Sequence, residues 1–188
     1  MSGTVVVIIN GTPYEVPISS GSGYITVTDR LNATNYDVNA SLTIPNYGPI
    51  NNSTKFSVSN ATGSFNVSVA NITYGDDFTI VVADAVGVNG ELLNGTVIVV
   101  INGTTYNVNV TNGSGNATYY KWLLVGDYDV NASLTVPNYN KIENSTKFIV
   151  NNATGSFNIN VANITYGGNF TIVVTDAVGV NGELLMVH

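Results

Sequence analysis

Two short stretches decide the fold: residues 65–69 read Phe65-Asn66-Val67-Ser68-Val69, and residues 78–82 read Phe78-Thr79-Ile80-Val81-Val82. In each stretch, every second residue is large and apolar. A period of two is typical of a β-strand that buries one face and leaves the other in water. Both stretches are therefore predicted to be strands with their apolar side chains on the same side.

The same alternation continues along the chain. Residues with turn propensity, such as Asn102-Gly103 and Pro137-Asn138, interrupt it at short intervals. Between these turns the pattern predicts five further strands, at 96–101, 105–110, 117–123, 128–136 and 147–150. Seven short strands without a helical stretch predict an all-β protein built as an immunoglobulin-like β-sandwich.

The chain repeats itself after 92 residues. Residues 36–43 recur as 128–135, residues 85–93 recur as 177–185, and about two-thirds of all aligned positions are identical. A period of this size suits one immunoglobulin-like domain per copy. We therefore expect tandem β-sandwiches of about 92 residues per repeat.

The match stops at both ends of the chain. The repeat predicts Asn-Gly-Thr after Leu185, but the chain reads Met186-Val187-His188, and Met1-Ser2 also stands outside the repeat. We expect residues 1–2 and 186–188 to be additions around an excerpt from a longer array.

Composition excludes several classes of chemistry. The chain has no cysteine and a single histidine, His188, so it offers no disulfide, no thiolate metal site and no Ser-His-Asp relay. A formal charge of −7 disfavours nucleic acid as a partner. No apolar run approaches the length of a membrane-spanning helix. We expect no cofactor and no enzymatic activity; paired carboxylates of the glycosidase kind share no predicted cleft.

Asparagine is unusually frequent and follows a pattern. The chain has 28 Asn and 18 Asn-x-Ser/Thr triplets, where random placement would give about five. One interpretation is a glycan-covered exterior, and the other is an Asn- and Thr-rich β protein without glycans. The acceptors predicted under the first interpretation are Asn10, Asn39, Asn60, Asn102, Asn131, Asn144 and Asn152.

Three runs carry a resemblance to a known family. They are Asn-Ile-Thr-Tyr-Gly-Asp-Asp-Phe-Thr-Ile-Val-Val at 71–82, Gly-Thr-Val-Ile-Val-Val-Ile-Asn-Gly-Thr-Thr-Tyr-Asn-Val at 95–108 and Gly-Asp-Tyr-Asp-Val at 126–130. The chain resembles the bacterial-Ig-like tandem repeats found in adhesin-like surface proteins of methanogenic archaea. The resemblance covers both copies, and its motifs indicate the repeat class rather than one ligand.

The resemblance implies where domains begin and end. In its register, residues 63–150 form one complete domain. Residues 3–58 are the last five strands of a preceding domain, and residues 155–185 are the first two strands of a following one. It also implies that Tyr36 and Tyr128 are corner tyrosines whose hydroxyl groups satisfy a backbone group, which is a structural role.

An incomplete sandwich needs its missing strands. The C-terminal segment carries them, with predicted inward side chains Phe157, Ile159, Val161, Phe170, Ile172 and Val174. Three closures are open: the segment completes a neighbouring chain and builds a head-to-tail homo-oligomer or filament, it folds back or is swapped within a dimer, or each 92-residue copy folds as a circular permutant.

Other candidate sites are weaker. Tyr120 and Trp122 are predicted to point outward, where they could stack on a sugar or fill a partner's pocket, or simply cover a neighbouring strand. The loop acids Asp84, Glu91, Asp176 and Glu183 could offer oxygens to calcium, but too few for a full site. An internal isopeptide bond would require a buried lysine. Lys55 and Lys147 should instead point to solvent.

Two functions follow from these features. The first is a non-enzymatic stalk or spacer of an extracellular, cell-surface adhesin-like protein that associates with itself. The alternative is an adhesive module that binds a surface glycan or a protein through a loop or through its outward aromatic residues.

Overall fold

The computed structural model describes residues 2–186, without the side chains of Ser2 and Asn181, and it confirms the all-β prediction. Apart from the single 3-10 turns η1 (Val88–Gly90) and η2 (Val180–Gly182), the elements of this range are strands. They are β1 (Ser2–Ile9), β2 (Thr12–Ser19), β3 (Asn35–Leu42), β4 (Ile50–Ser57), β5 (Ser64–Val69), β6 (Ile72–Thr73), β7 (Phe78–Val86), β8 (Gly95–Ile101), β9 (Thr104–Val110), β10 (Gly115–Tyr119), β11 (Gly126–Leu134), β12 (Ile142–Asn151), β13 (Ser156–Val161) and β14 (Ile172–Val178).

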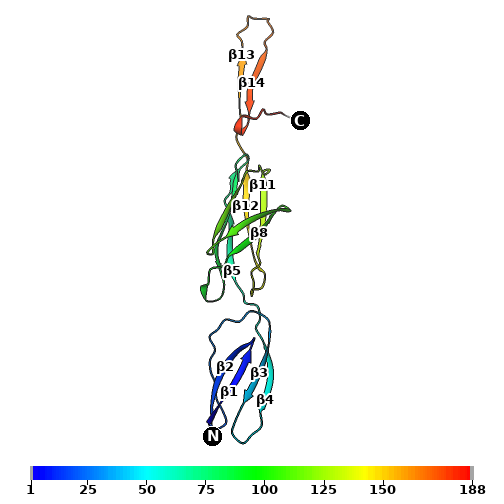
Figure 1. Cartoon of the computed structure of the whole chain (residues 1–188). Helices are drawn as coiled ribbons and strands as arrows, with labels where there is room; N and C mark the ends of the chain where they lie inside the picture. The colour runs from blue at the N-terminus through cyan, green and yellow to red at the C-terminus, as the bar shows by residue number, and fades with distance from the viewer. Residues whose placement is uncertain (1, 187–188) are drawn as a thin grey trace. The chain divides into compact units, whose positions relative to one another are not determined.

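The strands gather into two compact units. The first comprises the residues up to Thr62 together with Pro137–Asn140, and the second comprises Gly63–Val136 and the residues from Lys141 onward. Figure 1 draws both units and labels β1 to β4 in the first and β5, β8 and β11 to β14 in the second.

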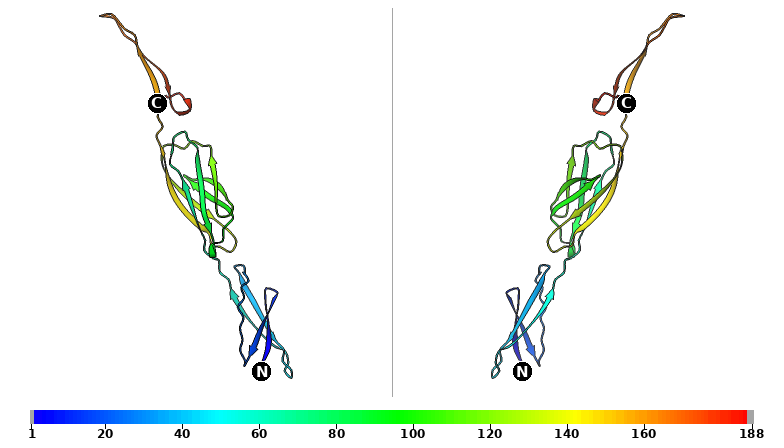
Figure 2. Two further views of the ribbon diagram at one scale, coloured as in Figure 1. Left: turned by 90° about the vertical axis from the view of Figure 1, so that its left-hand side faces the viewer. Right: turned by 90° about the vertical axis from the view of Figure 1, so that its right-hand side faces the viewer.

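The first unit contains one antiparallel sheet, in the order β2-β1-β3-β4. Strands β1 and β2 are joined by Asn10-Gly11, which take φ values of 50° and 77°. Positive φ at both residues gives the tight turn whose twist matches a two-stranded hairpin. Figure 2 shows this sheet from two sides, and no second sheet forms within the described part of this unit.

The second unit contains a complete sandwich. One sheet has the order β10-β7-β5 and the other the order β6-β12-β11-β8-β9. Their facing sides carry the core of the molecule, whose largest fully buried side chains are Phe78, Phe148, Ile80, Ile101 and Leu134. Figure 2 shows this unit from two opposite sides.

The sequence prediction and the structure differ most at three places. The short strand β6, which follows β5, was not predicted: β5 pairs with β7, whereas β6 pairs in parallel with β12. The side chain of Asn71 causes part of this switch, since its Oδ1 accepts the N–H of Ile149 at 2.8 Å. The strand predicted at 117–123 is β10, which ends at Tyr119, and the one predicted at 147–150 is β12, which begins at Ile142.

The second unit ends in a two-stranded sheet formed by β13 and β14; outside this hairpin, β14 makes only the bridge from Val178 to Leu184 among the described residues. Its local geometry repeats that of β5 and β7. Both hairpins have an irregular register after their first residue, and an aspartate in the left-handed region, with φ 53° at Asp84 and 54° at Asp176. The hairpin therefore already has the shape that its copy has inside the sandwich.

Within residues 2–186 there is no helix long and apolar enough to cross a membrane.

Candidate functional site

The central sandwich shows what strands β5 and β7 do when their partner sheet is present. Every inward side chain of the two strands is buried beneath the larger sheet. The set comprises Phe65, Val67, Val69, Phe78, Ile80 and Val82, none of them more than 8% exposed.

Phe78 is the centre of this contact. Its ring lies 6.1 Å from that of Phe148, 5.4 Å from Tyr106 and 5.6 Å from Tyr119, measured between centroids. Burial raises the pKa of the Tyr106 hydroxyl above its ordinary value. Aromatic pairs at these separations stabilise a core beyond the area that they bury.

The sheet β1–β4 has the same inward residues but lacks the second layer. Phe56 is 38% exposed, whereas its counterpart Phe148 is 1% exposed, and Ile50 is exposed where Ile142 is buried. Residues 23–27, which correspond to β10, form no strand pairing apart from the bridge that precedes them, and Ile25 and Val27 are exposed. One face of this sheet is thus apolar and uncovered in the described chain.

The hairpin β13–β14 lacks the larger sheet that covers its copy, β5–β7, in the central sandwich. Phe157 is 64% exposed where Phe65 is 3% exposed, and Phe170 is 62% exposed where Phe78 is 1% exposed. The other predicted inward side chains share this exposure: Ile159, Val161, Ile172 and Val174. The chain therefore presents an apolar sheet face without its hairpin and an apolar hairpin without its sheet.

Polar groups on β12 hold β5 and β6 at its edge. Asn144 Nδ2 donates to the carbonyl oxygen of Phe65, and Asn151 Nδ2 donates to that of Ile72 at 3.2 Å. Sequence reasoning missed Asn144 as a strand contact and treated it only as a glycan acceptor. The available signal was its place at an inward position between Ile142 and Phe148.

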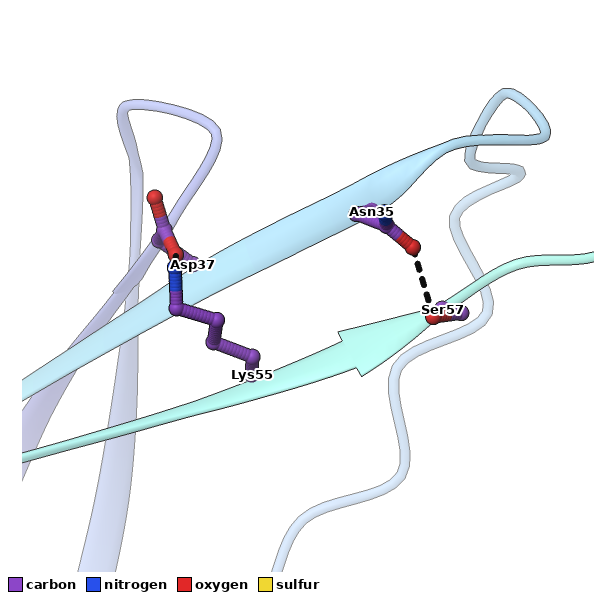
Figure 3. A network of polar contacts seen from close by, with 4 residues as sticks. All are labelled: Asn35, Asp37, Lys55 and Ser57. Atoms are coloured by element: carbon purple, nitrogen blue, oxygen red, sulfur yellow. Dashed lines mark hydrogen bonds and ion pairs between the residues drawn. The ribbon is translucent and has the colours of Figure 1, made fainter.

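The opposite face of the open sheet is polar and exposed to solvent, and its side chains form contacts with one another. Lys55 Nζ lies 2.8 Å from Asp37 Oδ1, and Ser57 Oγ donates to Asn35 Oδ1 at 2.6 Å, all on β3 and β4 (Figure 3). The hydrogen bond to Asp37 raises the pKa of Lys55. Lys147 makes the same contact with Asp129. Both lysines are exposed, as the alternation predicts, so neither lies in the apolar interior that an isopeptide bond requires.

The two tyrosines predicted at corners have equivalent contacts. Tyr36 OH donates to the carbonyl oxygen of Asn32 at 3.0 Å, and Tyr128 OH donates to that of Leu124 at 2.9 Å. Both rings are buried, and each stacks on a phenylalanine of the adjacent strand, Phe56 and Phe148 respectively.

Tyr120 and Trp122 lie beyond the end of β10, where they point outward. Tyr120 is 84% exposed and Trp122 is 50% exposed. Trp122 contacts Tyr74 edge to face, with centroids 6.0 Å apart. About half of the surface of Trp122 therefore remains accessible to solvent.

The loop acids do not come together as a metal site. Asp84 accepts a hydrogen bond from Asn66 Nδ2 at 2.9 Å, and Asp176 accepts one from Asn158 at 2.7 Å, so both act within their own hairpin. Among the described residues, no group of three or more acidic or histidine side chains is close enough to hold an ion. Glu91 and Glu183 each follow a 3-10 turn.

Most of the predicted glycan acceptors are accessible. Asn10, Asn39, Asn60, Asn102, Asn131 and Asn152 are exposed, whereas Asn144 is half-buried against β5.

No family model matches the chain, and no curated protein matches its sequence. Among the solved structures that are similar to it are three of adhesin segments. The first is a "tetra-tandem repeat in extending region of large adhesion protein", with 17% identity and a TM-score of 0.48 over 96% of this chain and 56% of that one. The second is a "1.5-MDa bacterial ice-binding adhesin", with 16% identity and a TM-score of 0.37 over 85% of this chain and 57% of that one.

The third is described as a "Ca2+-stabilized adhesin" that "helps an Antarctic bacterium reach out and bind ice". It has 16% identity and a TM-score of 0.35, over 85% of this chain and 43% of that one. The chain thus spans about half the length of each of the solved chains that it matches.

Proposed function

We propose that the chain is a non-enzymatic spacer module of an extracellular, adhesin-like surface protein, and that its copies join head to tail by strand complementation. The hairpin β13–β14 of one copy covers the open face of sheet β1–β4 of the next. Each junction then becomes a complete sandwich like the central one. The archaeal origin that the sequence resemblance implies stays a prediction.

One observation carries this proposal. A closely similar hairpin sequence is buried in the central sandwich and exposed at the C-terminal end, as Phe78 and Phe170 illustrate. The central sandwich therefore shows how the hairpin pairs when the site is filled. Ile80 pairs with Ala117 there, so Ile172 is expected opposite Ile25 in the junction between two copies.

The gain from closure is large. Each of the six exposed side chains stabilises the assembly by about 1.5–3 kcal/mol when fully buried, so the set contributes roughly 9–18 kcal/mol as an upper range. Backbone pairing of β14 with residues 23–27 would add to this, because it satisfies groups that face water in the open sheet. Ordering costs offset part of the gain.

The sequence leaves three closures open. In the permuted fold, β7 would pair with residues 23–27 of its own 92-residue copy. It pairs with β10 instead, which disfavours the permuted fold. Exchange between chains is favoured over folding back, because the strands of a complete sandwich, β5 to β12, separate the open sheet from the hairpin along the chain, and the hairpin would have to reach back past them.

The mass of the protein in solution tests the proposal. We expect light scattering to find concentration-dependent polymers of the unmodified chain. Ile172→Asp places a charge at a position that is fully buried in the central copy, at Ile80, so association should weaken at least about a hundredfold.

Val173→Asp is the matched control, because it changes the same strand on its outward face. Its counterpart Val81 remains 40% exposed even in the complete sandwich. This variant should polymerise like the unmodified chain. A chain that stays monomeric at all concentrations would contradict the proposal.

An adhesive module is the second candidate. Tyr120 and the free part of Trp122 favour it, because exposed aromatic rings stack on sugars. A glycan array that shows binding by the unmodified chain and none by Trp122→Ala would support this function.

A further inference from the structure

Asn144 marks the line along which strand β5 meets the larger sheet. Asn144 is a residue of β12 and lies opposite Ala132 of β11. Its Oδ1 accepts the N–H of Ser145 at 2.7 Å. That contact fixes the amide group so that Nδ2 faces β5 and donates to Phe65 O. Asn144 is half-buried as a result.

Asn52 is the counterpart of Asn144 on the open sheet, and it has the same local geometry. Asn52 is a residue of β4 and lies opposite Ala40 of β3. Its Oδ1 accepts the N–H of Ser53 at 2.8 Å. Its side chain is exposed, and its Nδ2 makes no hydrogen bond within the described residues. The donor group is therefore oriented before any hairpin arrives. In a completed junction it would donate to the carbonyl oxygen of Phe157 of a second copy.

The same nitrogen is a potential modification site, because Asn52-Ser53-Thr54 is an N-glycosylation triplet. In that reaction a bond forms between Nδ2 and C1 of a sugar. The bond between C1 and a lipid-linked diphosphate donor breaks, and the amide loses one proton to a base of the transferase. Asn52 lies on β4, the edge strand of its sheet, where an enzyme has access.

We propose that Asn52 is a glycan acceptor that controls association: unmodified, it anchors the hairpin of the next copy, and glycosylated, it blocks that hairpin. The inference rests on the proposed strand complementation. A sugar ring on Nδ2 would replace one of its two N–H groups and would occupy space that β13 needs, judged by the position of β5 beside Asn144. Asn144, covered by β5, stays unmodified once the central sandwich has folded.

The absence of cysteine allows a selective test. In Asn52→Cys, a maleimide-linked oligosaccharide attaches at this position alone. Asn51→Cys is the matched control, because Asn51 is the adjacent residue, points to the other face of β4 and is also exposed. Light scattering then measures association before and after coupling.

Coupled Asn52→Cys should lose at least about nine-tenths of its polymer, whereas coupled Asn51→Cys should associate like the unmodified chain. Uncoupled Asn52→Cys should still associate, because one hydrogen bond is worth only about 1 kcal/mol against six buried apolar side chains. Unchanged association after coupling at position 52, or loss of association before coupling, would overturn the proposal. If the unmodified chain itself never associates, strand complementation fails as well.

A second measurement uses the natural modification. When the chain is produced with an oligosaccharyltransferase and its lipid-linked donor, peptide mapping should find glycan at Asn52 in the monomer fraction and not in polymers. Asn144 should be unoccupied in both fractions. Glycan at Asn52 within polymers would contradict the proposal.

Discussion

Phe78 stacks on Phe148 across the central sandwich, with ring centroids 6.1 Å apart and planes inclined by 22°. Both rings are about 1% exposed. Their counterparts in the other copies, Phe170 and Phe56, are exposed. Among the described residues, Phe56 stacks on Tyr36 of its own sheet, and neither phenylalanine contacts a ring from a facing sheet. The contact inside one domain thus defines the contact expected between two molecules.

A double-mutant cycle tests this contact. Phe170→Ala and Phe56→Ala should each weaken association, and together they should weaken it less than the sum of their effects. A stacked aromatic pair gives a coupling energy of about 0.5–1.5 kcal/mol. Association constants from dilution experiments supply the four values. Val173, whose counterpart Val81 stays 40% exposed in the complete sandwich, should show no coupling to Phe56; equal coupling there would mean that the two phenylalanines do not meet.

The corner tyrosine of the central sandwich should be a stabilising residue. Tyr128→Phe removes the hydrogen bond to Leu124 O while it keeps the buried ring. We expect a loss of about 0.5–1.5 kcal/mol in the unfolding free energy of the sandwich, measured in urea. Tyr120→Phe, which removes an exposed hydroxyl, is the control and should be neutral. Equal stability of the two variants would argue against the corner role.

Trp122 separates the two candidate functions. If the chain is only a spacer, glycan arrays should detect no binding. Trp122→Ala should then cost about 1 kcal/mol or less, because the indole is half-exposed and contacts Tyr74 at its edge. Binding that Trp122→Ala abolishes and Tyr120→Ala weakens would favour the adhesive module instead.

The lysines should carry no covalent cross-link. Lys55 and Lys147 form ion pairs with Asp37 and Asp129 in water, far from the buried setting of an isopeptide bond. Intact-mass spectrometry should therefore give the mass of the sequence, without the loss of an ammonia or a water. A deficit of either kind, mapped to a lysine, would show that the exposed geometry is not the final one.

Much of the fold follows from the sequence alone. Alternation identifies the inward side chains of β7 because apolar and polar residues map directly onto the two faces of a strand. It fails at β12, where Asn144 and Thr146 occupy inward positions beside β5 and therefore look like loop residues. The switch between β5 and β6 was also missed, since it depends on a hydrogen bond from the N–H of Ile149 to the Asn71 side chain, which joins residues 78 positions apart.

The candidate site is predictable for a related reason. Its two halves are copies of segments that meet in the central sandwich, so the repeat identifies Phe170 and Phe56 as partners without any structure. The polar anchor at Asn52 needed the structure, because the sequence pattern does not reveal which asparagine donates to a strand and which faces water.

A covalent trap tests strand complementation most directly. In the central sandwich Thr79 and Thr118 lie opposite each other on β7 and β10, with their hydroxyl oxygens 2.8 Å apart. The counterparts are Thr171 and Thr26, and the chain has no cysteine of its own. In the variant with Thr171→Cys and Thr26→Cys, oxidation should join copy to copy and give a ladder of covalent polymers on a non-reducing gel. The variant with Thr171→Cys and Thr4→Cys should give none. A disulfide formed only within single chains, or no disulfide at all, would contradict head-to-tail complementation.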